Sequence, residues 1–149
     1  MIAPARGPGL PARSLNRLVA VAVGRLGLPL PGTWILHTRG RRSGRWHATP
    51  VCLAEIGGGR YLVAPRGETD WARNLRAGPE CELRRGGRRM RLRASEVAGE
   101  ERAAAVAEYV RRYGWLTRRF FDLPRRRPSS ADIAREARRH PTFLLRPGG

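Results

Sequence analysis

The stretch HATPVCLAEIGGGRYLVA, residues 47–64, predicts a β-hairpin. It contains two short runs that are typical of strands, residues 47–55 and 60–64, and three consecutive glycines separate them. Glycine adopts the positive φ angles that tight hairpin turns require, so residues 57–59 are the expected turn. Strands joined in this way run antiparallel.

A second hairpin is predicted over residues 80–97. Its strands, residues 80–85 and 88–97, flank the pair Gly86-Gly87. In the later strand Met90, Leu92 and Ala94 alternate with arginines at positions 89, 91 and 93. Because successive side chains of a strand point to opposite faces, we expect the arginine face to meet solvent or a ligand and not the core.

The remaining elements surround these hairpins. Residues 1–13 contain three prolines and two glycines and are expected to form a flexible arm. Five or six short strands with appended helices predict an α+β, mainly β fold: a small antiparallel barrel with peripheral helices, in a single domain over residues 14–149. The expected helices cover residues 14–26, 70–77, 100–113 and 125–139, and the further strands cover residues 34–38 and 142–145.

The net charge of the chain indicates which classes of partner it could bind. The 149 residues include 30 basic and 12 acidic side chains, a formal net charge of +18, and every basic residue is arginine. Such a charge favours polyanionic partners: nucleic acid, an anionic membrane surface, or a small molecule with several phosphates or carboxylates. No apolar stretch is long enough to span a bilayer, and the N-terminus does not resemble a secretory signal. We therefore expect a cytoplasmic protein.

The segment from Thr38 to Gly44 lies directly between two predicted strands and is a candidate phosphate clasp. Its two glycines let the backbone approach a ligand closely, Ser43 adds a hydroxyl, and Arg41 and Arg42 supply planar donors that match phosphate oxygens. A solvated β-turn explains the same residues equally well. The spacing matches neither a P-loop nor a dinucleotide-binding glycine motif.

A second candidate segment begins where the strand over residues 60–64 ends. Gly67 permits close approach of a ligand, and Trp71 and Asn74 follow on a predicted helix, one turn apart. Trp71 is either a stacking face for a ligand or a plug in the core.

Cysteine and histidine positions point to no metal site and no catalytic side chain. Cys52 and Cys81 lack the spacing of zinc ligands and are interpreted as small buried hydrophobic residues. A structural role is expected for His37 and His140. Only His47 lies close enough to the clasp to add a phosphate contact.

Taken in order, these motifs resemble the deazaflavin-dependent nitroreductase family, whose fold is the flavin-type split β-barrel. The family pattern is a strand ending in Thr-x-Gly-Arg-Lys/Arg-Ser/Thr-Gly, then Asn/Thr-Pro, then a strand ending in Lys/Arg-Gly, then Trp-x-x-Asn-Leu-x-Ala-x-Pro. The resemblance covers roughly residues 15–115 and the ending at residues 140–147. The matching segments are residues 34–44, 49–50, 62–67 and 71–79.

The resemblance implies binding of coenzyme F420, with flavin mononucleotide as the alternative, and hydride transfer from the reduced ring. That coenzyme carries a phosphodiester and several glutamates, so a positive groove would favour its binding. By match to the family motif, the phosphate would be held by Arg41, Arg42, Ser43 and Gly44, with Gly40 and His47 beside them. The ring would be lined or enclosed by Thr49, Pro50, Val63, Ala64, Arg66, Asp70, Trp71 and Asn74.

Beside this resemblance, we expect the acceptor to be a small molecule, a quinone or a nitro or enone compound, in a substrate pocket assigned to Cys52, Pro65, Tyr113 and Trp115. This chain carries Cys52 where nitroimidazole-reducing relatives have an aromatic residue, and Pro65 where they have serine. A smaller side chain at position 52 enlarges the space before the ring. We therefore expect a quinone to be preferred over a bicyclic nitroimidazole.

Two other interpretations stay open. A basic nucleic-acid-binding module without enzymatic activity fits the charge, but the chain lacks a recognisable nucleic-acid motif, and we expect no nucleic-acid partner. The helix predicted over residues 15–26 would also suit peripheral contact with the anionic inner face of a membrane, which is compatible with an enzyme. Split-barrel proteins occur as monomers and homodimers, and the sequence does not choose between them.

Overall fold

The computed structural model describes residues 33–148 of the chain. The predicted arm over residues 1–13 and the predicted helix over residues 14–26 lie outside this range. In chain order the elements are β1 (Thr33–Arg39), β2 (Trp46–Ile56), β3 (Gly59–Val63), α2 (Asp70–Ala77), β4 (Glu80–Arg85), β5 (Arg88–Glu96), α3 (Gly99–Thr117), the short 3-10 helix η1 (Arg118–Phe120), α4 (Ser130–Ala137) and β6 (Thr142–Pro147).

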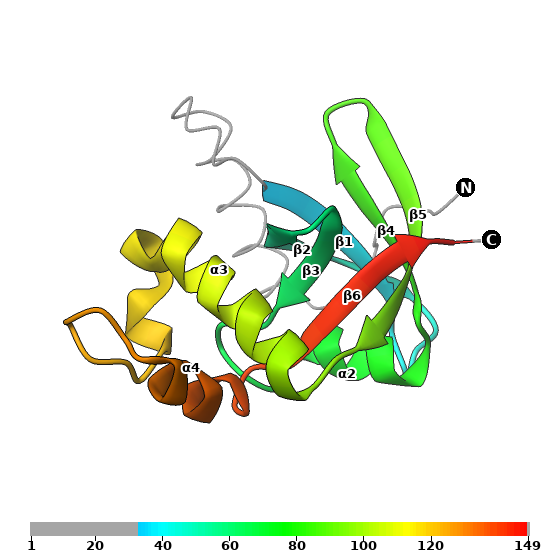
Figure 1. Ribbon diagram of the computed structural model, residues 1–149. Coiled ribbons are helices and arrows are strands. Elements are labelled where there is room, and N and C mark those ends of the chain that lie inside the picture. Colours follow the sequence, from blue (N-terminus) through cyan, green and yellow to red (C-terminus); the bar gives the residue numbers. More distant parts are fainter. Residues whose placement is uncertain (1–32, 149) are drawn as a thin grey trace.

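The six strands form a closed antiparallel barrel in the order β1-β2-β3-β6-β5-β4 (Figure 1). Both predicted hairpins are present, and β6 lies between β3 and β5. Pairing of β1 with β4 closes the barrel, with His37 opposite Glu82. The antiparallel barrel with peripheral helices is confirmed.

The first hairpin turn is shorter than predicted. Gly57 and Gly58 both have positive φ, +55° and +82°, whereas Gly59 already belongs to β3. Two consecutive residues with positive φ complete a tight hairpin turn, so the third glycine is free to pair with Ile56. The strand predicted over residues 80–85 has the bounds of β4, and the other strand boundaries differ from the prediction by at most two residues.

Two helices differ from the sequence prediction. The helix expected over residues 125–139 begins only at Ser130, because Ser129 and Asp132 form a capping box: the Ser129 hydroxyl accepts from the Asp132 amide at 3.1 Å, and the Asp132 carboxylate accepts from the Ser129 amide at 2.9 Å. Pro128 also disfavours helical backbone in the residue before it. In contrast, α3 runs on from residue 113 to Thr117.

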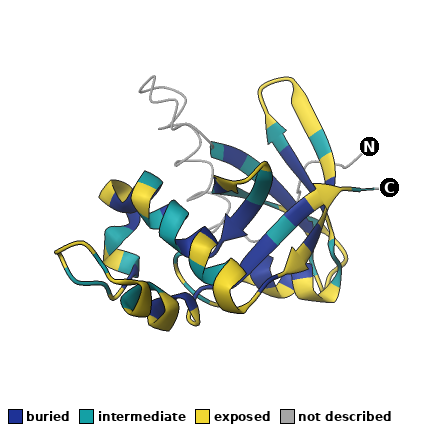
Figure 2. Cartoon of the chain, viewed as in Figure 1, coloured by how far each residue is buried: buried dark blue, intermediate teal, exposed yellow. Residues whose placement is uncertain are grey.

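Two hydrophobic clusters hold the molecule together. The barrel interior contains Trp34, Leu36, Leu62, Leu83 and Phe143, all 5% exposed or less. A second cluster fills the space between α3 and the outer faces of β2 and β3, and most of its members belong to these elements. Figure 2 shows the buried residues concentrated along the strands, while the far end of the β4–β5 hairpin is exposed.

The alternation predicted for β5 is confirmed. Leu92 and Ala94 are buried and Met90 packs against the barrel core, while the arginines between them are exposed. Within residues 33–148, no helix is long and apolar enough to cross a bilayer.

Glu82 is fully buried although it sits on the arginine-bearing face of the sheet. Its carboxylate forms ion pairs with Nε of Arg84 and, at 3.3 Å, with Nε of Arg89. His37 lies beside it on β1 and is 5% exposed. Burial, with the charge of Arg84 next, holds the pKa of His37 below its usual 6.5 despite the opposing effect of Glu82.

The low pKa of His37 predicts that the protein loses stability on acidification. Below pH 6.5 the unfolded chain takes up a proton at His37 that the folded chain resists, so unfolding becomes easier as the pH falls toward the lower folded-state pKa. Urea titrations at pH 7.5 and 5.5 should show the parent losing more stability than His37→Gln, which does not titrate. Equal losses in the two proteins would contradict a depressed pKa at this site.

Candidate functional site

The loop between β1 and β2 is a compact turn stabilised by its own backbone. The Gly40 amide donates to the Arg45 carbonyl at 2.7 Å, and the Gly44 amide donates to the Gly40 carbonyl at 2.9 Å. Gly44 has φ +70°, a value that side chains rarely tolerate. Arg39 adds a bond from its Nε to the Gly44 carbonyl at 3.2 Å. We call residues 39–45 the clasp loop.

Because Gly40 has no side chain, the side chains of Ser43 and His47 can both lie against it. A Cβ at this position would lie 2.7 Å from Ser43 Oγ and 2.8 Å from His47 Nε2. Any larger residue would push both side chains apart. The structure therefore places Gly40, Ser43 and His47 together, as the sequence predicts.

Helix α2 braces the clasp loop through Arg41. Asn74 Oδ1 accepts from the Arg41 amide at 3.2 Å and from its guanidinium at 2.8 Å. Asn74 Nδ2 donates to Thr38 Oγ1 at 3.3 Å, and Asp70 forms an ion pair with Arg41 at 3.4 Å. Asn74 is 4% exposed, so these hydrogen bonds are shielded from water. They link the clasp loop to α2 and to the end of β1.

Arg42 and Arg45 differ from Arg41, because among the described residues neither forms an ion pair. Both are exposed. Ser43 Oγ accepts from the Arg45 amide at 3.1 Å, which leaves the hydroxyl proton available to another acceptor. Two unpaired guanidinium groups and a free hydroxyl on a fixed turn are the donors that a phosphate requires, so the clasp loop fits the phosphodiester of a deazaflavin.

The second candidate segment, residues 64–67, is held by the residues that precede β6. The Ala64 amide donates to the Pro141 carbonyl at 2.9 Å, and the Ala64 carbonyl lies 2.8 Å from Nδ1 of the buried His140. Nε2 of that histidine lies 2.7 Å from a carboxylate oxygen of Glu136, itself 3% exposed. Each ring nitrogen of His140 therefore has a hydrogen-bond partner. Both contacts thus orient the ring and fix the segment.

The predicted ring-lining residues lie on both sides of the sheet. Thr49 is paired with Leu36 and shares its inner face, whereas Pro50 and Val63 belong to the outer side. Trp71 is 7% exposed and packs against Phe143 in the barrel core, with ring centres 6.0 Å apart. Ala64 is fully buried in that core as well.

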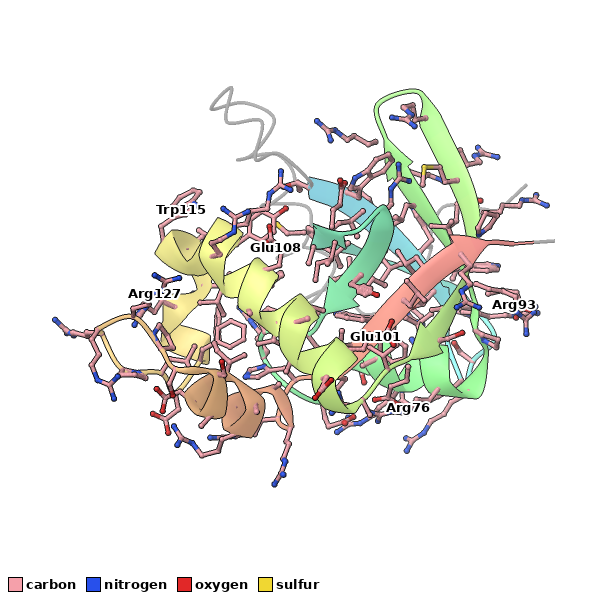
Figure 3. All side chains as sticks on the ribbon, viewed as in Figure 1. Arg76, Arg93, Glu101, Glu108, Trp115 and Arg127 are labelled. Atoms are coloured by element: carbon pink, nitrogen blue, oxygen red, sulfur yellow. The ribbon has the colours of Figure 1, made fainter. Side chains whose placement is uncertain are left out.

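Of the four residues assigned to the acceptor pocket, Cys52 and Tyr113 lie at the same cluster, whereas Trp115 and Pro65 lie elsewhere. Cys52 is partly buried against the cluster beneath α3, where burial raises the pKa of its thiol. Tyr113, in the same cluster, donates its hydroxyl to the Leu53 carbonyl at 2.7 Å, and burial raises its pKa to about 12. Trp115 is 71% exposed and points away from the barrel at the outer side of α3 (Figure 3). Pro65 lies elsewhere, in a pocket with Arg66.

That pocket has a volume of about 720 Å³ and joins the segment after β3 to the segment after α3. Most of this pocket could not be predicted from the sequence, because its walls are 50 to 75 residues apart in the chain. The arginine-rich composition of residues 118–139 was the available signal. The lining residues are Pro65, Arg66, Gly67, Arg119, Phe120, Phe121, Asp122, Glu136, Arg139 and His140.

Solved structures share this fold at low sequence identity. One, described as an F420-H2 dependent reductase, FDR-A, is 22% identical with a TM-score of 0.54 over 77% of this chain and 94% of its own. A conserved hypothetical protein from Mycobacterium tuberculosis is 17% identical with a TM-score of 0.55 over 87% and 80%. The heme storage protein HutZ from Vibrio cholerae is 18% identical with a TM-score of 0.52 over 79% and 82%. At this identity the likeness establishes the fold.

A comparison with curated proteins finds no match. A family model described as F420H(2)-dependent quinone reductase matches residues 12–119, which include the clasp loop, the segment after β3 and all of α2 and α3. The chain therefore belongs to the F420H(2)-dependent quinone reductase family, and its cofactor is coenzyme F420.

Proposed function

We propose that the clasp loop binds the phosphodiester of coenzyme F420 and that the adjoining segments position the ring for reduction of a quinone. This proposal rests on one observation: Arg41 and Arg42 differ in their contacts. Arg41 is engaged by Asn74 and Asp70, while the exposed Arg42 forms no ion pair within residues 33–148. The Arg42 guanidinium and the hydroxyl proton of Ser43 are therefore available to a ligand at this turn.

In this proposal, separate segments of the site bind the phosphate and the ring of the cofactor. Arg42, Ser43 and the Gly44 backbone hold the phosphate, and His47 lies close enough to add a donor. Residues 64–67, fixed by His140, form one wall beside the ring. When bound, reduced F420 supplies a hydride and a proton, which together convert a quinone to a hydroquinone, and no protein nucleophile is required.

Apolar residues limit water near the proposed ring site. Pro50 lies on the outer face of the barrel and is partly exposed, while Val63 is buried in the cluster beneath α3, with Cys52 packed against that cluster. An apolar surface beside the path of the hydride excludes competing reactions with water. These residues therefore favour a quinone, whose ring is itself largely apolar, as the acceptor.

Location and assembly stay predictions. A cytoplasmic location and contact with an anionic membrane are expected from the sequence, which does not choose between monomer and homodimer. One similar structure, 19% identical with a TM-score of 0.54, is described as a domain-swapped dimer, which is a property of that protein.

Cofactor selectivity tests the proposal directly. We expect micromolar or tighter binding of F420 and weaker binding of flavin mononucleotide, because the unpaired arginines suit a cofactor with several anionic groups. Fluorescence titrations of the purified protein with each flavin measure both affinities. Equal or reversed affinities would contradict the proposal, and raising the salt concentration should weaken F420 binding more than flavin mononucleotide binding.

A further inference from the structure

Two arginines from distant segments place their guanidinium groups over the same aromatic ring. Cζ of Arg66 lies 5.1 Å from the centre of the Phe120 ring, and Cζ of Arg119 lies 4.8 Å from it. Among the described residues, neither arginine forms an ion pair. The ring attracts each cation, but two like charges gathered at one ring also repel each other.

One other pair of arginines, Arg85 and Arg88, shares an aromatic ring in this way, that of Trp34. Other arginines face carboxylates. Arg76, for example, binds Glu68 and Glu96 at 2.7 Å each. In the pocket around Phe120, the Glu136 carboxylate is already directed at His140, and Asp122 is exposed without an ion pair in residues 33–148. The two cations at Phe120 thus lack the acidic partners that Arg76 has.

The pocket has room for a small molecule. Its volume of about 720 Å³ lies within the range of ligand pockets. Pro65, Phe120 and Phe121 provide an apolar surface, and the guanidinium groups provide planar pairs of donors that match a carboxylate. Ligand chemistry that satisfies both features is an aromatic ring that bears a carboxylate.

We propose that this pocket, between residues 65–67 and 119–122, binds an aromatic carboxylate through Arg66 and Arg119. Pro65 and Arg66 belong to the segment that our proposed function places beside the deazaflavin ring, so a ligand held here lies next to that ring. On that basis, which rests on the proposed function, the ligand is the acceptor: a quinone whose ring system carries a carboxylate.

Direct binding tests the pocket without any cofactor. Isothermal titration calorimetry with naphthalene-2-carboxylate should show binding, and the neutral naphthalene-2-carboxamide should bind at least about tenfold more weakly, because it loses the charge-assisted hydrogen bonds. Equal affinities for the two probes, or no binding of the carboxylate, would overturn the proposal. Because no deazaflavin is present, this failure is distinct from failure of the F420 titration.

Two variants distinguish binding in the pocket from attraction to the overall positive charge of the protein. Arg119→Gln should weaken naphthalene-2-carboxylate binding about tenfold or more. Arg126→Gln, which removes the same charge from an exposed position in the same segment and outside the pocket, should stay within twofold of the parent. Equal losses in both variants would show binding to bulk charge and overturn the proposal.

A competition experiment tests whether the pocket binds an aromatic carboxylate or the glutamate tail of the cofactor. Tri-γ-glutamate carries several carboxylates and no ring, and it represents the tail of the cofactor. We expect naphthalene-2-carboxylate to stay bound when this peptide is added at equal concentration. Displacement by the peptide, with peptide binding lost in Arg119→Gln, would assign the pocket to a glutamate tail and overturn the aromatic acceptor.

Discussion

Replacing Arg42 by alanine is expected to weaken F420 binding by about 1.5–3 kcal/mol, roughly 10- to 150-fold, while the fold stays intact. The reason is that Arg42 is exposed and forms no ion pair within residues 33–148, so its removal breaks no internal contact that holds the barrel. Fluorescence titration with F420 measures the affinity, and far-ultraviolet circular dichroism checks the fold.

Two further variants make the Arg42 result specific. Arg91→Ala removes an exposed arginine from β5 and should leave the affinity within twofold of the parent. Arg41→Ala should also weaken binding, but through a loosened clasp loop, because Arg41 is the residue that Asn74 holds. If Arg42→Ala also binds F420 within twofold of the parent, Arg42 is an ordinary solvated residue and the phosphate assignment is wrong.

Replacing Trp71 by alanine is expected to lower the free energy of unfolding by about 3–5 kcal/mol. The indole is 7% exposed and packs on Phe143 within the barrel core, so truncation leaves a cavity that the surrounding strands cannot fill. Urea denaturation measures the loss. A protein that keeps its stability but loses F420 affinity would instead show that Trp71 acts mainly on the ligand.

Trp115 provides the matched control for Trp71. It has the same side chain but is 71% exposed on α3, so Trp115→Ala should change the free energy of unfolding by no more than about 0.5 kcal/mol. A large loss at Trp115 would mean that its exposed face is covered in solution.

Local sequence signals were sufficient for the barrel. Paired glycines at positive φ define the first hairpin, and the alternation of Leu92 and Ala94 with arginines defines the buried face of β5. Both signals depend on neighbours within a few residues. The predicted range of the last helix began too early, at residue 125, because it included the arginine run and Pro128 that precede the capping box at Ser129.

The site was only partly predictable because its contacts join distant segments. The clasp loop was recognisable from its own residues, and its prediction as a binding site is still to be tested. That Asn74 holds Arg41 could not be read from the sequence, since 33 residues separate them and only the packing of α2 on β1 brings them together. The meeting of Arg66 with Phe120 likewise depends on how residues 118–122 return to the barrel.

The position of β6 has a consequence for how the chain reaches its folded state. Thr142 pairs with Val63 and Phe143 pairs with Glu96, so the last strand completes the sheet between two strands made long before it. Until β6 arrives, β3 and β5 expose unpaired edges, which are prone to association with other chains. During synthesis the ribosome must therefore release residues 142–147 before the barrel can close. The high contact order of these pairs predicts slow folding that is sensitive to C-terminal truncation.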